Sequence, residues 1–194
     1  MWVRLVAYDD QGKIVFESGA YDPSTGILSH DTQAKVYEVK QGLTPDLAGL
    51  LGKSAAEPFH FVLNNTVVKD NRIPPKGYTV AQYDRPGLRP VGAAYADGQY
   101  WDETQYLLPA ETDLVQAVLF YQTSSEDYID FLRHNGGVDG IALGELWEGS
   151  KSPPVVMAGA WSRGFQHYFP LIFALRLENL LTTVIGWLET FVTF

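Results

Sequence analysis

The feature that most constrains the fold is the apolar run over residues 114–121, LVQAVLFY. In an extended strand, successive side chains point to opposite faces of the sheet. One face then receives Val115, Ala117, Leu119 and Tyr121, and the other receives Leu114, Val118 and Phe120. Because apolar residues point to both sides, the run predicts a strand that is buried on both faces. It is the strongest strand signal in the chain.

An N-terminal hairpin is the second β signal. Val3, Leu5 and Ala7 alternate with polar or opposite-face residues, residues 9–12 (DDQG) form a turn, and residues 14–16 return. Residues 22–26 (DPSTG) predict another turn. Eleven Tyr, ten Phe, eighteen Gly and eleven Pro suit strands joined by many turns, so we expect a mainly β, antiparallel, sandwich-like domain. Shorter strands are expected at 35–39, 59–63, 67–68, 78–80 and 91–94.

Short helices are expected at three places. A helical turn is predicted to begin at Pro45, where the missing N–H costs nothing. A helix from Ser124 to about His134 has acidic residues in its first turn and basic ones in its last, and Gly136-Gly137 ends it. A further short helix is predicted over residues 141–147.

The chain divides into an expected β-domain, 1–160, and a tail, 161–194. We expect an amphipathic C-terminal helix that begins at Pro170. Charged residues interrupt the tail, so no transmembrane span is predicted. It could dock on its own domain, contact a partner or a membrane surface, or come from a shifted reading frame. The apolar stripe would contain Phe173, Leu177, Leu180, Leu181, Val184, Leu188, Phe191 and Val192.

Charge and cysteine content exclude several classes of function. The net charge of −9 argues against nucleic-acid binding, which needs clustered Lys and Arg. The absence of cysteine excludes disulfides, Cys-ligated zinc, iron–sulfur clusters and covalently attached c-type haem. We therefore expect no cofactor. Met1 is followed at once by a strand, so no signal peptide is indicated, which favours either a cytoplasmic protein or a piece of a longer one.

Four segments together suggest a family. They are the hairpin 2–19, the loop 69–78 (KDNRIPPKGY), and residues 101–106 and 119–123. In this order they are similar to the haem-free C-terminal region of bacterial multihaem c-type cytochromes, the cytochrome c554-related group. The resemblance covers residues 2–158, and the loop is its most specific element.

The resemblance implies a β-sandwich-like module in a periplasmic or extracellular electron-transfer protein. Such a module would be non-catalytic, would support electron transfer structurally, and would have a haem-bearing cytochrome segment or subunit as its partner. Two features depart from the family. The C-x-x-C-H sites and the G-H-x-x-P-T-G strand that precede the hairpin in the family are missing here, and the tail has no counterpart.

The 69–78 loop is expected to be structural. Asp70 or Asn71 would close a turn through its side chain, and Arg72 would pair with a carboxylate. Two prolines would keep the loop extended, because neither can donate to a β-ladder. The residues assigned to this structural loop are Lys69, Asp70, Asn71, Arg72, Pro74 and Pro75.

A metal site is a weaker hypothesis. Asp97, Asp102 and Glu103 could supply oxygen ligands for calcium, although their spacing is not that of an EF-hand loop. His30 could approach the haem of a neighbouring chain as an axial ligand. Solvated loop carboxylates are the default interpretation.

Two other functions remain open. The first is an independent ligand- or carbohydrate-binding β-domain. The second, a hydrolase whose pocket holds Asp70, Arg72 and a histidine, ranks last, so we expect no enzyme. An open sheet edge beside Trp2–Ala7 would favour the cytochrome hypothesis, and a clustered aromatic face would favour the ligand-binding domain. The aromatic residues of that face would be Tyr95, Tyr100, Trp101 and Tyr106.

Overall fold

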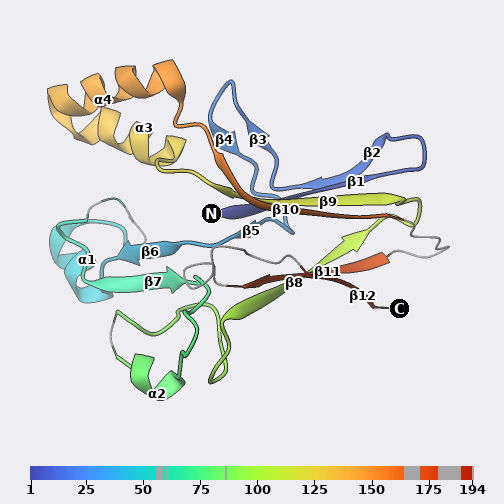
Figure 1. Cartoon of the computed structure of the whole chain (residues 1–194). Helices are drawn as coiled ribbons and strands as arrows, with labels where there is room; N and C mark the ends of the chain where they lie inside the picture. Colours follow the sequence, from blue (N-terminus) through green and yellow to red (C-terminus); the bar gives the residue numbers. More distant parts are fainter. Residues whose placement is uncertain (56–58, 60, 86, 164–170, 179–188, 194) are drawn as a thin grey trace. The chain divides into compact units, whose positions relative to one another are not determined.

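The computed structural model describes residues 1–55, 59, 61–85, 87–163, 171–178 and 189–193 (Figure 1). Strands hold 35% of the residues and helices 22%, which confirms the mainly β prediction. The chain forms two compact units. Unit 1 is Met1–Val36, Glu103–Leu177 and Trp187–Phe194, and unit 2 is Tyr37–Asp102 and Glu178–Gly186.

Unit 1 contains an antiparallel five-stranded sheet (Figure 1). Its main path runs from β10 (Val155–Arg163) through β9 (Leu114–Tyr121) and β1 (Trp2–Tyr8) to β2 (Ile14–Ser18). The fifth strand, β5 (Lys35–Val36), also pairs with β1. The 2–18 hairpin and the 114–121 strand are therefore confirmed, and both β1 and β9 have strand partners on two sides.

Burial of β9 differs between its two faces. Val115, Ala117 and Leu119 are buried, whereas Val118 and Phe120 on the other face are half-buried. The prediction of a strand buried on both faces is thus right for one face only.

Trp2 closes the half-buried face at one end of β1. Its ring stacks on Phe120 with centroids 5.4 Å apart and lies 5.7 Å from the ring of Tyr21. The indole N–H donates a 3.2 Å hydrogen bond to the carbonyl of Gly19. A buried indole that finds both aromatic neighbours and a hydrogen-bond acceptor fixes the end of the strand.

The described part of the tail is β-structure, which makes the helix prediction wrong there. A three-stranded sheet joins β12 (Glu189–Thr193), β11 (Leu171–Glu178) and β8 (Trp101–Leu108). Leu175 and Leu177 are buried while the residue between them is half-exposed, which is the two-residue period of a strand. Phe173, Phe191 and Val192 of the expected stripe also lie in these strands, Leu180, Leu181, Val184 and Leu188 lie outside the described residues, and the expected domain boundary at residue 160 falls inside β10.

Two helices form a hairpin that departs from the sheet after β9 (Figure 1). The first, α3 (Glu126–Asn135), is capped by Ser125, whose hydroxyl accepts from the Tyr128 N–H at 3.4 Å. This confirms the helix predicted after Ser124. The second, α4 (Gly137–Ser150), extends well beyond the predicted 141–147.

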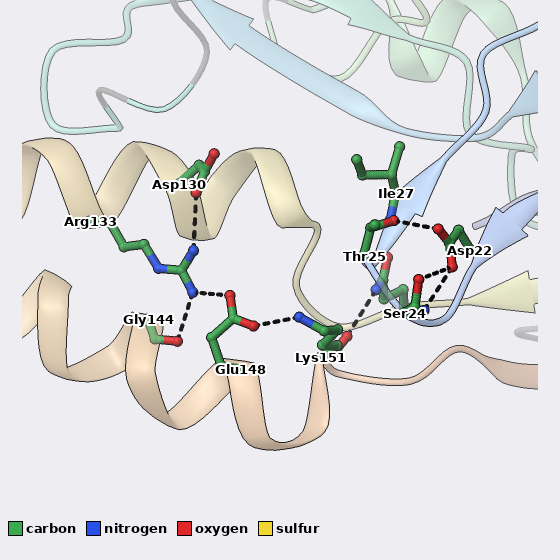
Figure 2. A network of polar contacts seen from close by, with 10 residues as sticks. Asp22, Ser24, Thr25, Ile27, Asp130, Arg133, Gly144, Glu148 and Lys151 are labelled. Atoms are coloured by element: carbon green, nitrogen blue, oxygen red, sulfur yellow. Dashed lines mark hydrogen bonds and ion pairs between the residues drawn. The ribbon is translucent and has the colours of Figure 1, made fainter.

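A polar network joins the two helices (Figure 2). The Arg133 guanidinium on α3 donates to the Gly144 carbonyl at 2.9 Å and to Glu148 at 2.5 Å. Lys151, just after α4, donates to the other oxygen of Glu148 at 2.5 Å. Close to this network in the same view, Asp22 closes the turn of a small hairpin by accepting from residues 24 and 25.

That small hairpin pairs β3 (Tyr21–Asp22) with β4 (Ile27–Leu28), so the 22–26 turn is confirmed. Gly26 supplies the positive φ of +81° that the end of the turn needs.

Unit 2 is built on the antiparallel pair β6 (Val39–Gly42) and β7 (Thr66–Asp70). The helix α1 (Pro45–Leu51) begins at the predicted proline. Residues 78–80, predicted as a strand, instead lead into the short helix α2 (Val80–Tyr83).

Two more strand predictions in unit 2 are wrong. Residues 61–63 form a turn, in which the side chains of Phe61 and Val62 are exposed. Residues 91–94 make only one isolated bridge, between Val91 and Asp70. No helix in the described ranges is long and apolar enough to cross a membrane.

Candidate functional site

A cavity of about 250 Å³ lies in unit 2, where the chain leaves β7. Tyrosine and proline side chains make most of its walls, and one Asp–Arg pair supplies its charged groups. Its lining residues are Asp70, Arg72, Ile73, Pro74, Pro75, Tyr78, Tyr83, Leu88 and Pro90.

Asp70 is fixed by its backbone from two sides. It pairs with Val39 in the β6–β7 ladder. Its N–H and C=O also exchange hydrogen bonds of 2.7 and 2.9 Å with Val91. Since its residue is only 6% exposed, its carboxylate is held in one place at the cavity.

The Asp70 carboxylate accepts three hydrogen bonds from Arg72. Oδ1 accepts from the Arg72 backbone N–H at 3.2 Å and from Nε at 2.9 Å, and Oδ2 accepts from Nη2 at 2.7 Å. The hydrogen bonds to this carboxylate raise the pKa of Arg72 above its ordinary value. The loop therefore contains both the side-chain turn and the Arg–carboxylate pair that its sequence indicates.

Asn71 connects the loop to neighbouring segments of unit 2. Its side-chain oxygen accepts from the Glu38 N–H at 2.9 Å, and its carbonyl accepts from the Tyr95 hydroxyl at 3.0 Å. Burial, reinforced by the charges of Asp102 and Asp70, raises the pKa of Tyr95, so its proton stays available for this hydrogen bond. These hydrogen bonds hold residue 71 in place between the cavity-lining residues Asp70 and Arg72.

Lys69 has a structural role beside the cavity. Its ammonium donates to Glu38 at 2.7 Å, and Lys40 lies 3.3 Å from the same oxygen. Burial alone would raise the pKa of Glu38, but the bond from Lys69 and the charge of Lys40 outweigh burial and lower that pKa. The contact between Lys69 and Glu38 links β7 to the residue that precedes β6.

The aromatic wall comes from residues that sequence reasoning missed. The rings of Tyr78 and Tyr83 lie 4.9 Å apart, one before and one at the end of α2. Thr79 starts this helix, because its hydroxyl accepts from the Gln82 N–H at 3.4 Å. Thr-x-x-Gln is a capping-box pattern, so it is the signal that could have replaced the predicted strand with a helix.

The calcium candidates are used elsewhere. Asp97 accepts from the Val80 N–H at 2.7 Å, and Asp102 accepts from the Tyr37 hydroxyl at 2.8 Å. Glu103 is exposed. Within the described residues, no three acidic or histidine side chains gather as a metal site would require.

The predicted aromatic face is not assembled. Tyr95 is 7% exposed and Tyr106 is fully buried. Tyr100 and Trp101 make an edge-to-face pair 5.3 Å apart, and Lys76 lies over the Tyr100 ring at 5.7 Å. Among the described residues lining the cavity there is no histidine, so the hydrolase arrangement of aspartate, arginine and histidine is not brought together there.

Charge is distributed unevenly around the cavity. Residues 69–90 contain five basic and two acidic residues, a local charge of +3 in a chain of net charge −9. This segment supplies every lining residue of the cavity. Carboxylates from outside the segment also meet it, since Glu38 accepts from Lys69 and Asp97 accepts from the Val80 N–H, so the cationic group of the cavity wall is the Arg72 guanidinium.

Comparison with protein-family models, curated proteins and solved structures finds no match for the chain. The likeness to multihaem cytochromes accordingly rests on the sequence motifs alone.

Proposed function

We propose that the chain is a non-catalytic binding module whose ligand site is the cavity beside β7. One observation carries this proposal: Arg72 is held by Asp70 at a cavity walled by tyrosine and proline. Both Asp70 oxygens accept from Arg72, so this carboxylate is engaged in positioning and not in moving protons. Apolar walls with a few fixed polar groups are typical of ligand sites.

The sheet supports an independent ligand-binding domain. An open edge beside β1 would suit a missing preceding strand, but β1 is paired with β2 on one side and β9 on the other. Sugar binding is the narrower form of this proposal, because sugars stack on aromatic rings and the half-buried ring of Tyr83 lines the cavity.

Amide chemical shifts of the full chain can test the site. We would titrate with phenylacetate, glucose and cyclohexanol as probes. At least one of them should shift the amides of Arg72, Ile73 and Tyr78 saturably. Tyr83→Trp, which fills the cavity, should abolish the shifts, while Tyr121→Trp on the exposed end of β9 should not. If no probe binds, or binding is confined to unit 1, the proposal is wrong.

A second candidate is the cytochrome-associated module, located in the periplasm or outside the cell. The hairpin motif supports it, since Trp2 is buried where the motif places it and Gly19 accepts its indole N–H. In this role the domain would pack on a haem-bearing segment or subunit. C-x-x-C-H motifs in the same reading frame upstream, or in an adjacent gene, are expected; their absence from both would remove this candidate.

The sandwich arrangement belongs to the same proposal. It is supported by rows of buried side chains on both sheets of unit 1, including Leu5 and Val115 on one and Leu108 and Leu175 on the other. Each sheet then has an apolar face to cover, as in two-layer β folds. Nuclear Overhauser contacts between methyl groups of Leu5 and Leu175 or Leu108 are expected, and their complete absence would exclude the sandwich.

A further inference from the structure

Arg72 has donors left over after it binds Asp70. A guanidinium has five N–H groups, and Asp70 uses the one on Nε and one on Nη2. In the described part of the chain, Asp70 provides the only side-chain acceptors of Arg72. The Nη1–Nη2 edge, which can hold a second planar anion through two parallel hydrogen bonds, remains available.

The pairing also prepares Arg72 for a ligand. Arginine normally loses side-chain freedom when it binds, and that loss weakens binding. Here Asp70 has already fixed the guanidinium, although its side chain remains 58% exposed.

The apolar side chains that line the cavity indicate what the uncharged part of the ligand is. Half-buried Tyr83 offers a ring, buried Tyr78 packs beside it 4.9 Å away, and Pro75 and Leu88 add apolar surface. Flat apolar groups pack well on such rings. The volume of about 250 Å³, below the roughly 300–1,000 Å³ of drug-sized sites, suits one ring and a short arm.

We propose that this cavity binds a carboxylate attached through a short arm to one flat apolar ring. The carboxylate takes the Nη1–Nη2 edge of Arg72, and the ring lies against Tyr83 and Leu88. This inference rests on the proposed binding function and names the ligand class of the same site. The carboxylate can belong to a free small molecule or to the C-terminus of a peptide that ends in an aromatic residue.

The first test uses the unmodified full chain and two probes of nearly equal shape, phenylacetate and phenylacetamide. Titration followed by amide chemical shifts should show saturable binding of phenylacetate at Arg72, Ile73 and Tyr78. Phenylacetamide should bind at least tenfold more weakly, because it lacks the charge that forms two strong hydrogen bonds. Equal binding of both probes would overturn the carboxylate assignment while leaving the binding function intact.

Failure of phenylacetate together with success of a neutral probe such as glucose or cyclohexanol would also overturn only this inference. Failure of every probe would overturn the proposed function as well. The two proposals can therefore fail separately.

A pair of variants tests the role of the guanidinium fork. Arg72→Lys keeps the charge but loses the planar fork, so phenylacetate affinity should fall at least tenfold. Arg163→Lys is the matched control, since Arg163 is 66% exposed and paired with Asp113 at 3.2 Å. The control should keep its affinity within twofold. Unchanged affinity in Arg72→Lys would overturn the assignment of the anchor.

The source of the carboxylate is tested with Gly-Gly-Phe and its C-terminal amide. If the peptide acid binds within threefold of phenylacetate and the amide does not, a peptide terminus is the ligand. Binding of phenylacetate without the peptide acid identifies a free small molecule. Both results support the shared chemistry, whereas preference for the peptide amide over the acid would contradict it.

Discussion

Residue 26 must be glycine for two reasons, a positive φ and close packing against Trp147. Its φ is +81°, and a Cβ at this position would lie 2.5 Å from Cη2 of Trp147 on α4. Trp147 is 6% exposed, so its ring cannot move without disturbing buried contacts. The β3–β4 turn thus packs on α4 only because residue 26 has no side chain.

Replacing Gly26 with alanine should therefore lower the free energy of unfolding by more than backbone strain alone would. Gly12→Ala is the matched control, since Gly12 has a φ of +79° and nothing within 4 Å of its added Cβ. We expect the control to lower the free energy of unfolding by about 1 kcal/mol. Gly26→Ala should lose a further ~1–3 kcal/mol through overpacking. Urea denaturation measures both; equal losses would mean that Trp147 yields easily.

The lowered pKa of Glu38 predicts a pH dependence of stability. The Glu38 carboxyl has a lower pKa in the folded protein than in the unfolded chain, where the pKa of glutamate is about 4.3. The stabilisation is therefore present above that pH and is lost as the pH falls through the lower folded pKa. Lys69→Met should reduce this loss, because it removes the hydrogen bond that lowers the pKa.

The effect is measured as the free energy of unfolding between pH 6 and pH 3. As Lys69 and Glu38 are partly exposed, we expect a difference of under ~1 kcal/mol. Lys76→Met is the control, since Lys76 lies over Tyr100 and not beside Glu38. The same acid response in wild type and Lys69→Met would contradict the prediction.

At the residue scale, local contacts could be predicted and distant ones could not. Asp70 and Arg72 are two positions apart, so residue types alone indicate their pairing. The hydrogen bond between Asn71 and Glu38 joins residues 33 positions apart. Tyr83 enters the cavity only because α2 turns it there. No spacing in the sequence encodes such contacts.

At the element scale, small residues bring α3 and α4 together. An added Cβ on Gly140 would lie 2.1 Å from the carbonyl oxygen of Leu132, and one on Gly144 would lie 2.2 Å from Nε of Arg133. The first obstacle is backbone, which cannot move aside without separating the helices. The close approach also lets Arg133 reach the Gly144 carbonyl (Figure 2).

Two glycine-to-alanine substitutions in α4 should change the free energy of unfolding in opposite directions. Gly140→Ala should lower the free energy of unfolding by more than ~2 kcal/mol and expose α3 amides to hydrogen exchange, since the hairpin must open. Gly149→Ala meets nothing within 4 Å and should raise stability by up to ~1 kcal/mol through helix propensity. Destabilisation by both would show that helix propensity is unimportant here.

Element prediction succeeded where the signals were local. The cap at Ser125 and the charge order along α3 identify that helix without tertiary information. The segment 171–178 satisfies a helical stripe and also a two-residue alternation. Pairing with β12 favours the strand, and that pairing depends on residues well over ten positions away.

At the scale of the whole molecule, the net charge of −9 predicts a salt response. Like charges repel in the compact chain, and raising the salt from about 0.01 to 0.15 M shortens the screening length from roughly 30 to 8 Å. The melting temperature at pH 7 should therefore rise with sodium chloride. Near the pI of 4.8 this rise should vanish. A melting temperature that falls with salt at pH 7 would mean that ion pairs outweigh the repulsion.

The β-rich class of the whole chain could be predicted from its turns and aromatic content, but its division into two units could not. Unit 2 occupies mainly residues 37–102, between two parts of unit 1. No proline-rich or glycine-rich linker in the sequence marks the passage at residue 36 or at residue 103. Long-range pairing alone defines these boundaries.

The pairing of β1 with β9 also determines when the sheet can form. Trp2 lies opposite Phe120, so during synthesis β1 can pair fully with β9 only after residue 120 has emerged. Closing so long a loop costs entropy before any contact compensates for it, which places folding on the millisecond-to-second scale of non-local β proteins. Until then the apolar strand Trp2–Tyr8 lacks its central partner, and unpaired apolar strands make incompletely folded chains prone to aggregate.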